Sequence, residues 1–310
     1  MSSELQVVGL GMCTLDVLMR LKDMPTWERG TRVSDLRLDG GGPVGTAMVT
    51  AARLGARVGF IGTAGDDEAA GLKLHSMIEA GVDTSRVVTH PGPDDQVVIV
   101  FVHEETGERM FAGVARERRA LTAEDLDRDY ITSAEYLHLD GFHFEAALQA
   151  AKWMREAGKK VVLDGHKTNR PIRSHLRELI EYVDVLISGS GFARSLTGIS
   201  DIWEAGRAAL DIGLSIFVQT EGEEGSYTIN AEERFHTPAF KVHVVDTTGA
   251  GDVFHGAYIV GLLNGWGLQQ IAQFATAASA IECTKLGGRV GIPCFGEVTS
   301  FLNERGLHVA

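Results

Sequence analysis

The sequence predicts an α/β fold in which helices cover both faces of a doubly wound, mostly parallel sheet. Short apolar runs of strand length alternate with longer segments of helical periodicity, as in proteins with parallel sheets. Glycine-rich turns precede two of the expected helices, and acidic or hydroxyl side chains follow several expected strands. Since the carboxyl ends of parallel strands form the ligand-binding edge of such sheets, a ligand site is expected there.

The alternation extends over nearly the whole chain. Strands are expected near 5–10, 55–62, 136–139, 160–163, 184–187, 214–220, 226–229 and 234–235. Helices are expected near 43–54, 66–80, 123–129, 144–157, 173–181, 201–212, 250–264, 268–283 and 296–304. A further strand is expected to end at Val245, because Val242, Val244 and Val245 are β-branched.

Two segments, at about 14–39 and 95–113, depart from this pattern. The first contains rough apolar–polar alternation, and the second contains a hairpin signal at Glu104–Gly107 between apolar arms. The chain contains no repeats and no linker-like stretch. We therefore expect one α/β domain over residues 1–310, with a small β lid inserted at these two places.

Composition and charge exclude several classes of function. The formal net charge of -13 disfavours binding to nucleic acids and to anionic membranes, and 44% hydrophobic residues suffice for a large core. The three cysteines have no spacing typical of a zinc site or a disulfide framework. No basic segment followed by an apolar run opens the chain, so we expect a cytoplasmic protein.

The strongest candidate site is the turn Asp246–Asp252, which opens an apolar helix. Backbone N–H groups of Gly249, Ala250 and Gly251 lie at the expected helix start, where unpaired N–H groups and the helix dipole favour a phosphate. Asp252 follows in the first turn, where the dipole should keep its pKa low. A carboxylate beside a phosphate site is explained if it contacts a substrate hydroxyl; a purely structural turn is the alternative.

A second glycine-rich turn and several strand ends add candidates. Gly40–Gly42, followed by Pro43, opens the helix near 43–54 and allows close approach of a ligand to the backbone. Asp16 follows the first strand, and Asp140 follows a later one. We expect these acidic side chains at the ligand edge of the sheet.

Together the two turns resemble signatures of the ribokinase-like (PfkB) family of carbohydrate kinases. The first signature runs from Gly40 to Asp67 and includes Phe60–Asp67, and the second is Asp246–Gly256. The closest similarity is to the sulfofructose kinase and ketohexokinase-like members. The resemblance implies a ribokinase-like fold and transfer of the γ-phosphoryl group of ATP to a hydroxyl of a ketose or related sugar.

The resemblance also implies roles for individual residues. Asp252 would be the base, and the amides of Gly249, Ala250 and Gly251 the anion hole. The expected substrate-binding residues are Asp16, Gly41, Gly42, Thr46 and Asp140. The expected nucleotide-binding residues are Thr220, Gly222, Gly225, His255 and Gly288. Asp246 and Thr248 would bind a monovalent cation such as K⁺. Mg²⁺ would be bound together with ATP. The lid would pair two copies of the chain in a homodimer.

Two departures from the family pattern limit what the resemblance implies, one about metal binding and one about the substrate. The family's N-x-x-E element, linked to magnesium and phosphate, would fall near Ser188–Ala193, which contain neither Asn nor Glu. Positions that bind the sulfonate in sulfofructose kinase correspond to Thr31, Gly113 and Phe142, none of which is charged. A sulfonated sugar is therefore not expected unless Arg32 or Arg116 supplies the charge.

Three other functions fit parts of the pattern. A nucleoside kinase of the same family would use the same anion hole and stack its base on an aromatic ring; the candidates are Phe101, Phe111, Phe142 and Phe144. A sugar- or nucleotide-sensing protein would bind without turnover, although the intact Asp252 disfavours it. A dinucleotide-binding oxidoreductase is disfavoured because Gly9–Thr14 lacks the last glycine of G-x-G-x-x-G.

Overall fold

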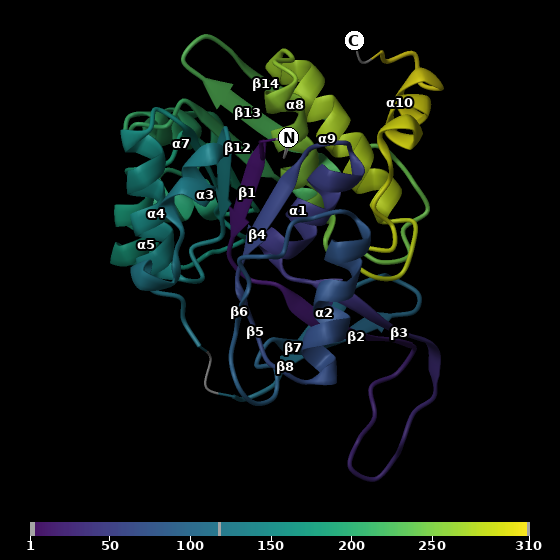
Figure 1. The fold of residues 1–310 in the computed structure, drawn as a ribbon. Coiled ribbons are helices and arrows are strands. Elements are labelled where there is room, and N and C mark those ends of the chain that lie inside the picture. Colours follow the sequence, from purple (N-terminus) through teal and green to yellow (C-terminus); the bar gives the residue numbers. More distant parts are fainter. Residues whose placement is uncertain (1–3, 117–118, 309–310) are drawn as a thin grey trace.

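An eight-stranded sheet forms the centre of the computed structural model, which describes residues 4–116 and 119–308 (Figure 1). In order across the sheet, the strands are β4 (Val58–Ile61), β1 (Val7–Leu10), β9 (Tyr136–Leu139), β10 (Lys160–Asp164), β11 (Val185–Ser188), β12 (Ile216–Thr220), β13 (Ser226–Asn230) and β14 (Arg234–Thr237). The strands from β4 to β12 pair in parallel, whereas β13 and β14 pair antiparallel. The predicted mostly parallel, doubly wound sheet is confirmed.

Successive strand side chains enter two separate cores, because neighbouring residues of a strand point to opposite faces. Val7 belongs to one core and Val8 to the other. The first core is covered by α1 (Pro43–Arg53), α2 (Glu68–Glu79), α8 (Ala250–Leu263), α9 (Leu268–Glu282) and α10 (Phe295–Asn303). The second is covered by α3 (Arg128–Ser133), α4 (Phe144–Glu156), α5 (Ser174–Ile180), α6 (Phe192–Thr197) and α7 (Ile202–Leu210).

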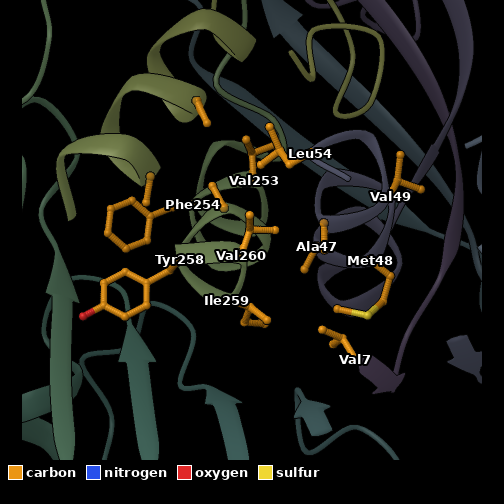
Figure 2. Close-up of a cluster of buried hydrophobic side chains, with 14 of the residues drawn as sticks. Val7, Ala47, Met48, Val49, Leu54, Val253, Phe254, Tyr258, Ile259 and Val260 are labelled. Carbon is orange, nitrogen blue, oxygen red and sulfur yellow. The ribbon is translucent and has the colours of Figure 1, made fainter. Parts of the chain in front are cut away.

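Helix α8 is held in the first core beside α1 (Figure 2). Every residue from Val253 to Gly261 is buried, which explains why this stretch is apolar on all sides. Gly256 allows the close approach of the two helices, because an added Cβ would lie 2.6 Å from Thr50 Cβ. Burial of each large apolar side chain contributes about 1.5–3 kcal/mol, so the start of α8 is rigidly placed.

The segments predicted to form a lid make a separate four-stranded sheet. Its order is β3 (Val33–Gly41), β2 (Thr14–Leu21), β7 (Val97–His103) and β8 (Arg109–Gly113), with β2 and β7 parallel and both outer pairs antiparallel. Figure 1 shows this sheet beyond the ends of the central strands, next to α2. A third, two-stranded sheet joins β5 (Thr63–Ala64) and β6 (Val88–Thr89).

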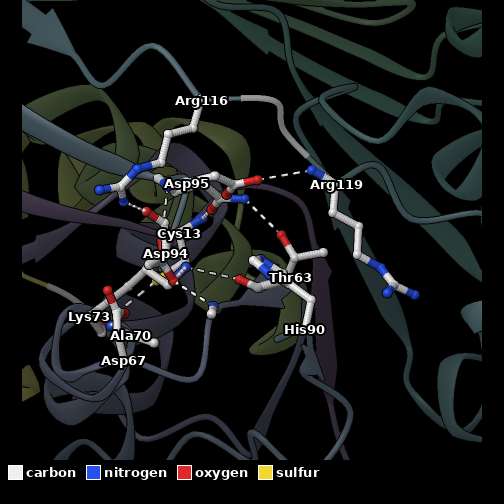
Figure 3. Close-up of polar contacts among 12 residues, drawn as sticks. Cys13, Thr63, Asp67, Ala70, Lys73, His90, Asp94, Asp95, Arg116 and Arg119 are labelled. Atoms are coloured by element: carbon white, nitrogen blue, oxygen red, sulfur yellow. Dashed lines mark hydrogen bonds and ion pairs between the residues drawn. The ribbon is translucent and has the colours of Figure 1, made fainter. Parts of the chain in front are cut away.

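A buried polar network holds the base of the second sheet (Figure 3). Lys73 Nζ lies 2.6 Å from Asp94 Oδ2 and donates to the carbonyl of Thr63 at 2.9 Å, and both charged side chains are fully buried. Asp94 also accepts from the backbone N–H groups of Gly65 and Gln96. The Thr63–Gly65 part of the first signature therefore fixes the point where the chain enters β7.

Two expectations about elements need correction, and one short helix was missed. Val242–Val245 is not a strand, because Val245 N–H donates to the carbonyl of Cys283 and no strand pairs with the segment. The helix expected near 123–129 is divided into a 3-10 turn at Ala123–Asp125 and helix α3. The short helix α6 was not predicted from the sequence. None of the helices in the described ranges has the length and hydrophobicity of a membrane span.

Candidate active site

The candidate site lies at the carboxyl edge of the central sheet. Asp164 is the last residue of β10, Thr220 is the last residue of β12, and Asp140 follows β9. The start of α8 approaches the same edge, since the charges of Asp164 and Asp252 influence each other. Residues far apart in the sequence are thus brought to one place by the parallel strand order.

The turn before α8 needs glycine at one position and leaves open space at another. Gly249 has φ of 85°, and an added Cβ would lie 2.8 Å from the carbonyl oxygen of Gly288. Gly251 is exposed, and a Cβ there would meet no atom within 4 Å. The first N–H groups of a helix have no intrahelical partner, so this exposed helix start can receive an anion.

Asp252 lies in the first turn of α8 and is partly exposed. Burial and, to a smaller extent, the negative charge of Asp164 raise its pKa to about 7, although His166 and Arg109 act in the opposite direction. The helix dipole was expected to keep this pKa low, but desolvation and the nearby carboxylate outweigh it. Near neutral pH the group can therefore accept a proton from a hydroxyl.

A histidine–carboxylate pair lies beside Asp252. His166 has φ of 55°, donates its backbone N–H to Asp164 Oδ1 at 2.7 Å, and places Nδ1 3.4 Å from Asp164 Oδ2. The charge of Asp164 raises the pKa of His166. Burial opposes ionisation of Asp164, but His166 and His255 keep the pKa of Asp164 below its usual value. Asp252 therefore lies beside two groups with opposite effects on its pKa: His166 lowers it and Asp164 raises it.

His255 lies beneath this pair rather than at the surface. Its ring is 4% exposed, Nε2 is 3.9 Å from Asp164 Oδ1, and the ring packs edge-on against His138 with centroids 5.4 Å apart. Burial lowers its pKa. The residue predicted to bind nucleotide thus contacts the site through Asp164.

Asp16 lies on β2, where the second sheet meets the central one. Its Oδ1 accepts from Thr14 Oγ1 at 2.6 Å, and a Cβ on Gly41 would overlap its other oxygen. Burial raises the pKa of Asp16 to about 6, and its charge acts on Asp252. Gly42, with φ of 86°, starts α1 against the backbone of Met12. The structure therefore brings Asp16 and Gly41 together near the base.

Two other residues predicted to bind the substrate use their side-chain oxygens for hydrogen bonds within the protein. Asp140 is buried, and its two oxygens accept from the backbone N–H groups of Met12 and Phe142 at 2.8 and 2.9 Å. Thr46 is fully buried on α1, and its hydroxyl accepts from Arg289 Nε at 3.4 Å. Both side chains support the loops around Asp16.

The predicted nucleotide turn follows β12. Thr220 Oγ1 donates to the carbonyl of Ser188 at 3.3 Å, which ties the ends of β11 and β12 together. Gly222 and Gly225 have φ of 57° and 95°, and Glu221 N–H donates to the carbonyl of Gly225 at 2.7 Å. Gly288 packs on Gly249 instead, so it lies with the anion site.

The predicted monovalent-cation residues form a buried turn. Asp246 Oδ1 accepts from Thr248 N–H and Oγ1, and its Oδ2 accepts from Gly287 N–H at 3.0 Å. Nearby Glu282 is fully buried, and its carboxyl lies beside the thiol of Cys283. Burial raises the pKa of Glu282 well above its usual value, and the charge of Asp246 adds to this. A positive charge would satisfy this acidic pocket.

Sequence reasoning missed the cationic side chains around the site. Arg109, at the start of β8, donates from its guanidinium to Thr247 Oγ1, and Lys167 follows His166. No local motif marks either residue, because the second sheet brings Arg109 to a turn distant in sequence. The described residues contain no group of three or more His, Cys, Asp or Glu side chains that could hold a metal.

Comparison with known proteins identifies the family. The model for pfkB family carbohydrate kinases matches residues 6–293, so the chain belongs to this family. A 5-dehydro-2-deoxygluconokinase from Shouchella clausii (strain KSM-K16) is 28% identical, with 97% of each chain covered. The ribokinase structure from Thermotoga maritima has 25% identity and a TM-score of 0.83, covering 96% of this chain and 99% of the other. An E. coli ribokinase II structure in complex with ATP and Mg²⁺ has 22% identity and a TM-score of 0.85, covering 97% and 99%.

The family membership confirms the expected class of activity. The chain is an ATP-dependent sugar kinase, a phosphotransferase with a hydroxyl group as acceptor. Membership of this family disfavours two of the alternatives, a sensor without turnover and a dinucleotide-dependent oxidoreductase.

Proposed function

We propose that Asp252 deprotonates and orients the acceptor hydroxyl while the start of α8 binds the transferred phosphoryl group. The observation that carries this proposal is a carboxylate with a pKa of about 7 beside an exposed helix start at the carboxyl edge of the sheet. Phosphoryl transfer needs in-line positioning and neutralisation of spreading charge. The N–H groups of Gly249, Ala250 and Gly251 would supply fixed donors for that charge.

The order of proton transfer follows from the loose transition state of this reaction. Ionised Asp252 accepts a hydrogen bond from the acceptor hydroxyl and takes its proton as the new phosphate ester forms. His166 limits the accumulation of negative charge around Asp252, Asp164 and the phosphates. Asp16 and the backbone of Gly41 and Gly42 would fix the sugar so that one hydroxyl faces Asp252.

The experiment is a coupled measurement of ADP release with a panel of sugars. Wild-type protein should release ADP with at least one acceptor, and Asp252→Asn should fold normally yet lose on the order of 10² to 10⁴ in turnover. Near-wild-type turnover in that variant would remove Asp252 from the role of base.

Magnesium would enter with the nucleotide as MgATP. The Ser188–Ala193 segment lacks the family's N-x-x-E element, and the described residues offer no cluster of metal-binding side chains. The related E. coli structure with ATP and Mg²⁺ supports this substrate. Thr220, Gly222 and Gly225 would contact the nucleotide at the end of β12.

A monovalent cation such as K⁺ would bind at Asp246 and Thr248. The buried carboxyl of Glu282 supports this proposal, because burial and the charge of Asp246 disfavour its ionised form and a bound cation would offset both. We expect K⁺ to raise the melting temperature relative to a large organic cation, and Asp246→Asn to abolish the difference. Equal melting temperatures in both salts would contradict the proposal.

We also propose that the second sheet covers the acceptor and pairs two copies of the chain. Among the described residues, no strand pairs with the outer edges of β3 and β8, and Leu36 and Leu38 on β3 are 55% and 54% exposed. Light scattering should give the mass of a dimer, and the double variant Leu36→Glu, Leu38→Glu should give a monomer. A monomeric wild type would end this proposal.

One observation favours a nucleoside as an alternative acceptor. Phe101 and Phe111 line the cavity of the second sheet, where a base could stack on an aromatic ring. Nucleosides therefore belong in the acceptor panel, and ADP release with a nucleoside in preference to every sugar would establish this alternative.

A further inference from the structure

A cavity of about 610 Å³ lies between the second sheet and the catalytic turn. Strands β2, β7 and β8 supply most of its wall, and Lys167 and Thr247 close it on the side of the central sheet. Thr247 precedes the anion-binding turn at Gly249–Gly251. Through Thr247 the cavity lies next to this turn, and its volume suits a sugar-sized molecule.

The ionisable side chains of this wall are predominantly cationic. Lys22, Arg109 and Lys167 line the cavity, whereas Glu108 is the acidic member of the lining. Lys22 is already paired with Glu105, at 3.1 Å. Arg109 and Lys167 have no carboxylate partner among the described residues. Lys22 is neutralised by Glu105, and Glu108 offsets one of the two remaining cations, Arg109 and Lys167. The wall therefore retains about one net positive charge.

This local positive charge contrasts with the rest of the molecule. The whole chain carries a formal charge of -13, and Asp16, Asp164 and Asp252 all lie near the reacting position. An anionic acceptor would be repelled by these groups unless fixed cations compensated locally. Arg109 and Lys167 are exposed and have no carboxylate partner among the described residues, so both can offer their charge to an anionic ligand in this cavity.

Arg109 also lies close to the proposed base, Asp252. Its guanidinium donates to Thr247 Oγ1, and its charge acts on Asp252. It therefore lies between the wall of the cavity and the base. A sugar with one hydroxyl at Asp252 could direct a group a few atoms away toward Arg109 and Lys167.

We propose that the acceptor is a sugar carrying a single anionic group, which Arg109 and Lys167 bind. This inference rests on the proposed kinase function and names its class of acceptor. A carboxylate matches the single net charge of the wall and the planar guanidinium of Arg109, whereas a phosphate monoester would bring a second negative charge. Neither Arg32 nor Arg116, the residues considered from sequence, lines the cavity; Arg116 donates to the carbonyl of Asp94 instead.

The test compares ADP release with sugar acids, the matching neutral sugars, sugar phosphates and a sulfosugar. The variants are Arg109→Met and Lys167→Met, with Lys22→Met as the matched control because Lys22 lines the same cavity but is paired with Glu105. A charge-assisted contact is worth about 10- to 100-fold in affinity. Each of the first two variants should therefore lower kcat/KM for the best sugar acid by about 10- to 100-fold and leave the neutral analogue within about threefold.

The possible outcomes separate the two proposals. Preference for neutral sugars, or equal losses for acid and neutral acceptors in the Arg109 and Lys167 variants, would overturn the anionic acceptor while the kinase function stands. Preference for a sugar phosphate would overturn the single charge. No ADP release with any acceptor would overturn the proposed function and this inference with it. A selective loss for the sugar acid, absent from Lys22→Met, is the supporting result.

Discussion

The two halves of the site are built in different ways. The proposed phosphoryl half consists of backbone groups and one carboxylate: Gly249 in a left-handed conformation, the start of α8, and the partly exposed Asp252 with its raised pKa. The acceptor half consists of exposed side chains on a small, separate sheet, such as Arg109, together with the buried Asp16. The first half uses groups that any phosphoryl transfer needs. In the second half, substitution of a few side chains can alter which substrate is bound. Variants of the two halves should therefore differ in the kinetic parameter that they change.

Apart from the loss of Asp252, the largest effect should come from filling the phosphate position. Gly251→Val places a side chain in the open space over the helix start, so turnover should fall on the order of 10² to 10³, as when an oxyanion donor is lost. The melting temperature should stay close to that of Gly71→Val, a matched control in which an exposed glycine of α2 also has no neighbour within 4 Å. Full activity of Gly251→Val would show that no phosphate binds there.

A smaller effect is expected in the acceptor half. Asp16→Asn removes a charged acceptor for sugar hydroxyls, so the acceptor KM should rise about 10- to 100-fold with kcat within a few-fold of wild type. Asp35→Asn, an acidic position on β3 beside Arg37, should change neither constant. A fall in kcat without a change in KM would move Asp16 to the phosphoryl half.

The pH dependence should report the base. Because only ionised Asp252 accepts the proton, and burial places its pKa at about 7, kcat/KM should fall about tenfold per unit at pH values below 7. His166→Gln removes a positive charge that lowers this pKa, so the inflection should move to higher pH. An inflection that stays in place in His166→Gln would contradict the contact between these charges.

The smallest effect concerns stability. The pKa of Asp252 is raised above its unfolded value, so the folded state retains a proton that the unfolded state loses, and stability falls as pH rises from about 4 to 7. Asp252→Asn should therefore raise the free energy of unfolding at pH 8, by about 1–3 kcal/mol after allowance for partial exposure. The gain should shrink toward pH 4.5 in paired denaturation curves. A variant less stable than wild type at pH 8 would show that Asp252 is not desolvated.

The turn and helix of the proposed phosphoryl half could be predicted from the sequence because their signals are local. Glycine before an apolar helix and Asp252 in the first turn are neighbours in the chain, and hydrophobic periodicity predicts the strands that place them. The segment Val242–Val245 shows the limit, because β-branched residues favour an extended backbone but do not provide a partner strand.

The acceptor half could be predicted only in part. Its strands were expected from alternation, but Arg109 and Lys167 become neighbours of one cavity only through the packing of the second sheet. The buried Lys73–Asp94 pair, which fixes the entry to β7, also joins residues with no shared motif. The pKa of Asp252 depends on desolvation and on Asp164, which no local pattern contains.

The most direct measurement is steady-state kinetics of Asp252→Asn and Arg109→Met side by side, with MgATP and the best acceptor of the panel. The two-part site predicts that Asp252→Asn lowers kcat on the order of 10² to 10⁴ with little change in acceptor KM. Arg109→Met should instead raise acceptor KM about 10- to 100-fold, with kcat within a few-fold of wild type. If both variants changed the same constant by similar factors, the division into a phosphoryl half and an acceptor half would be wrong.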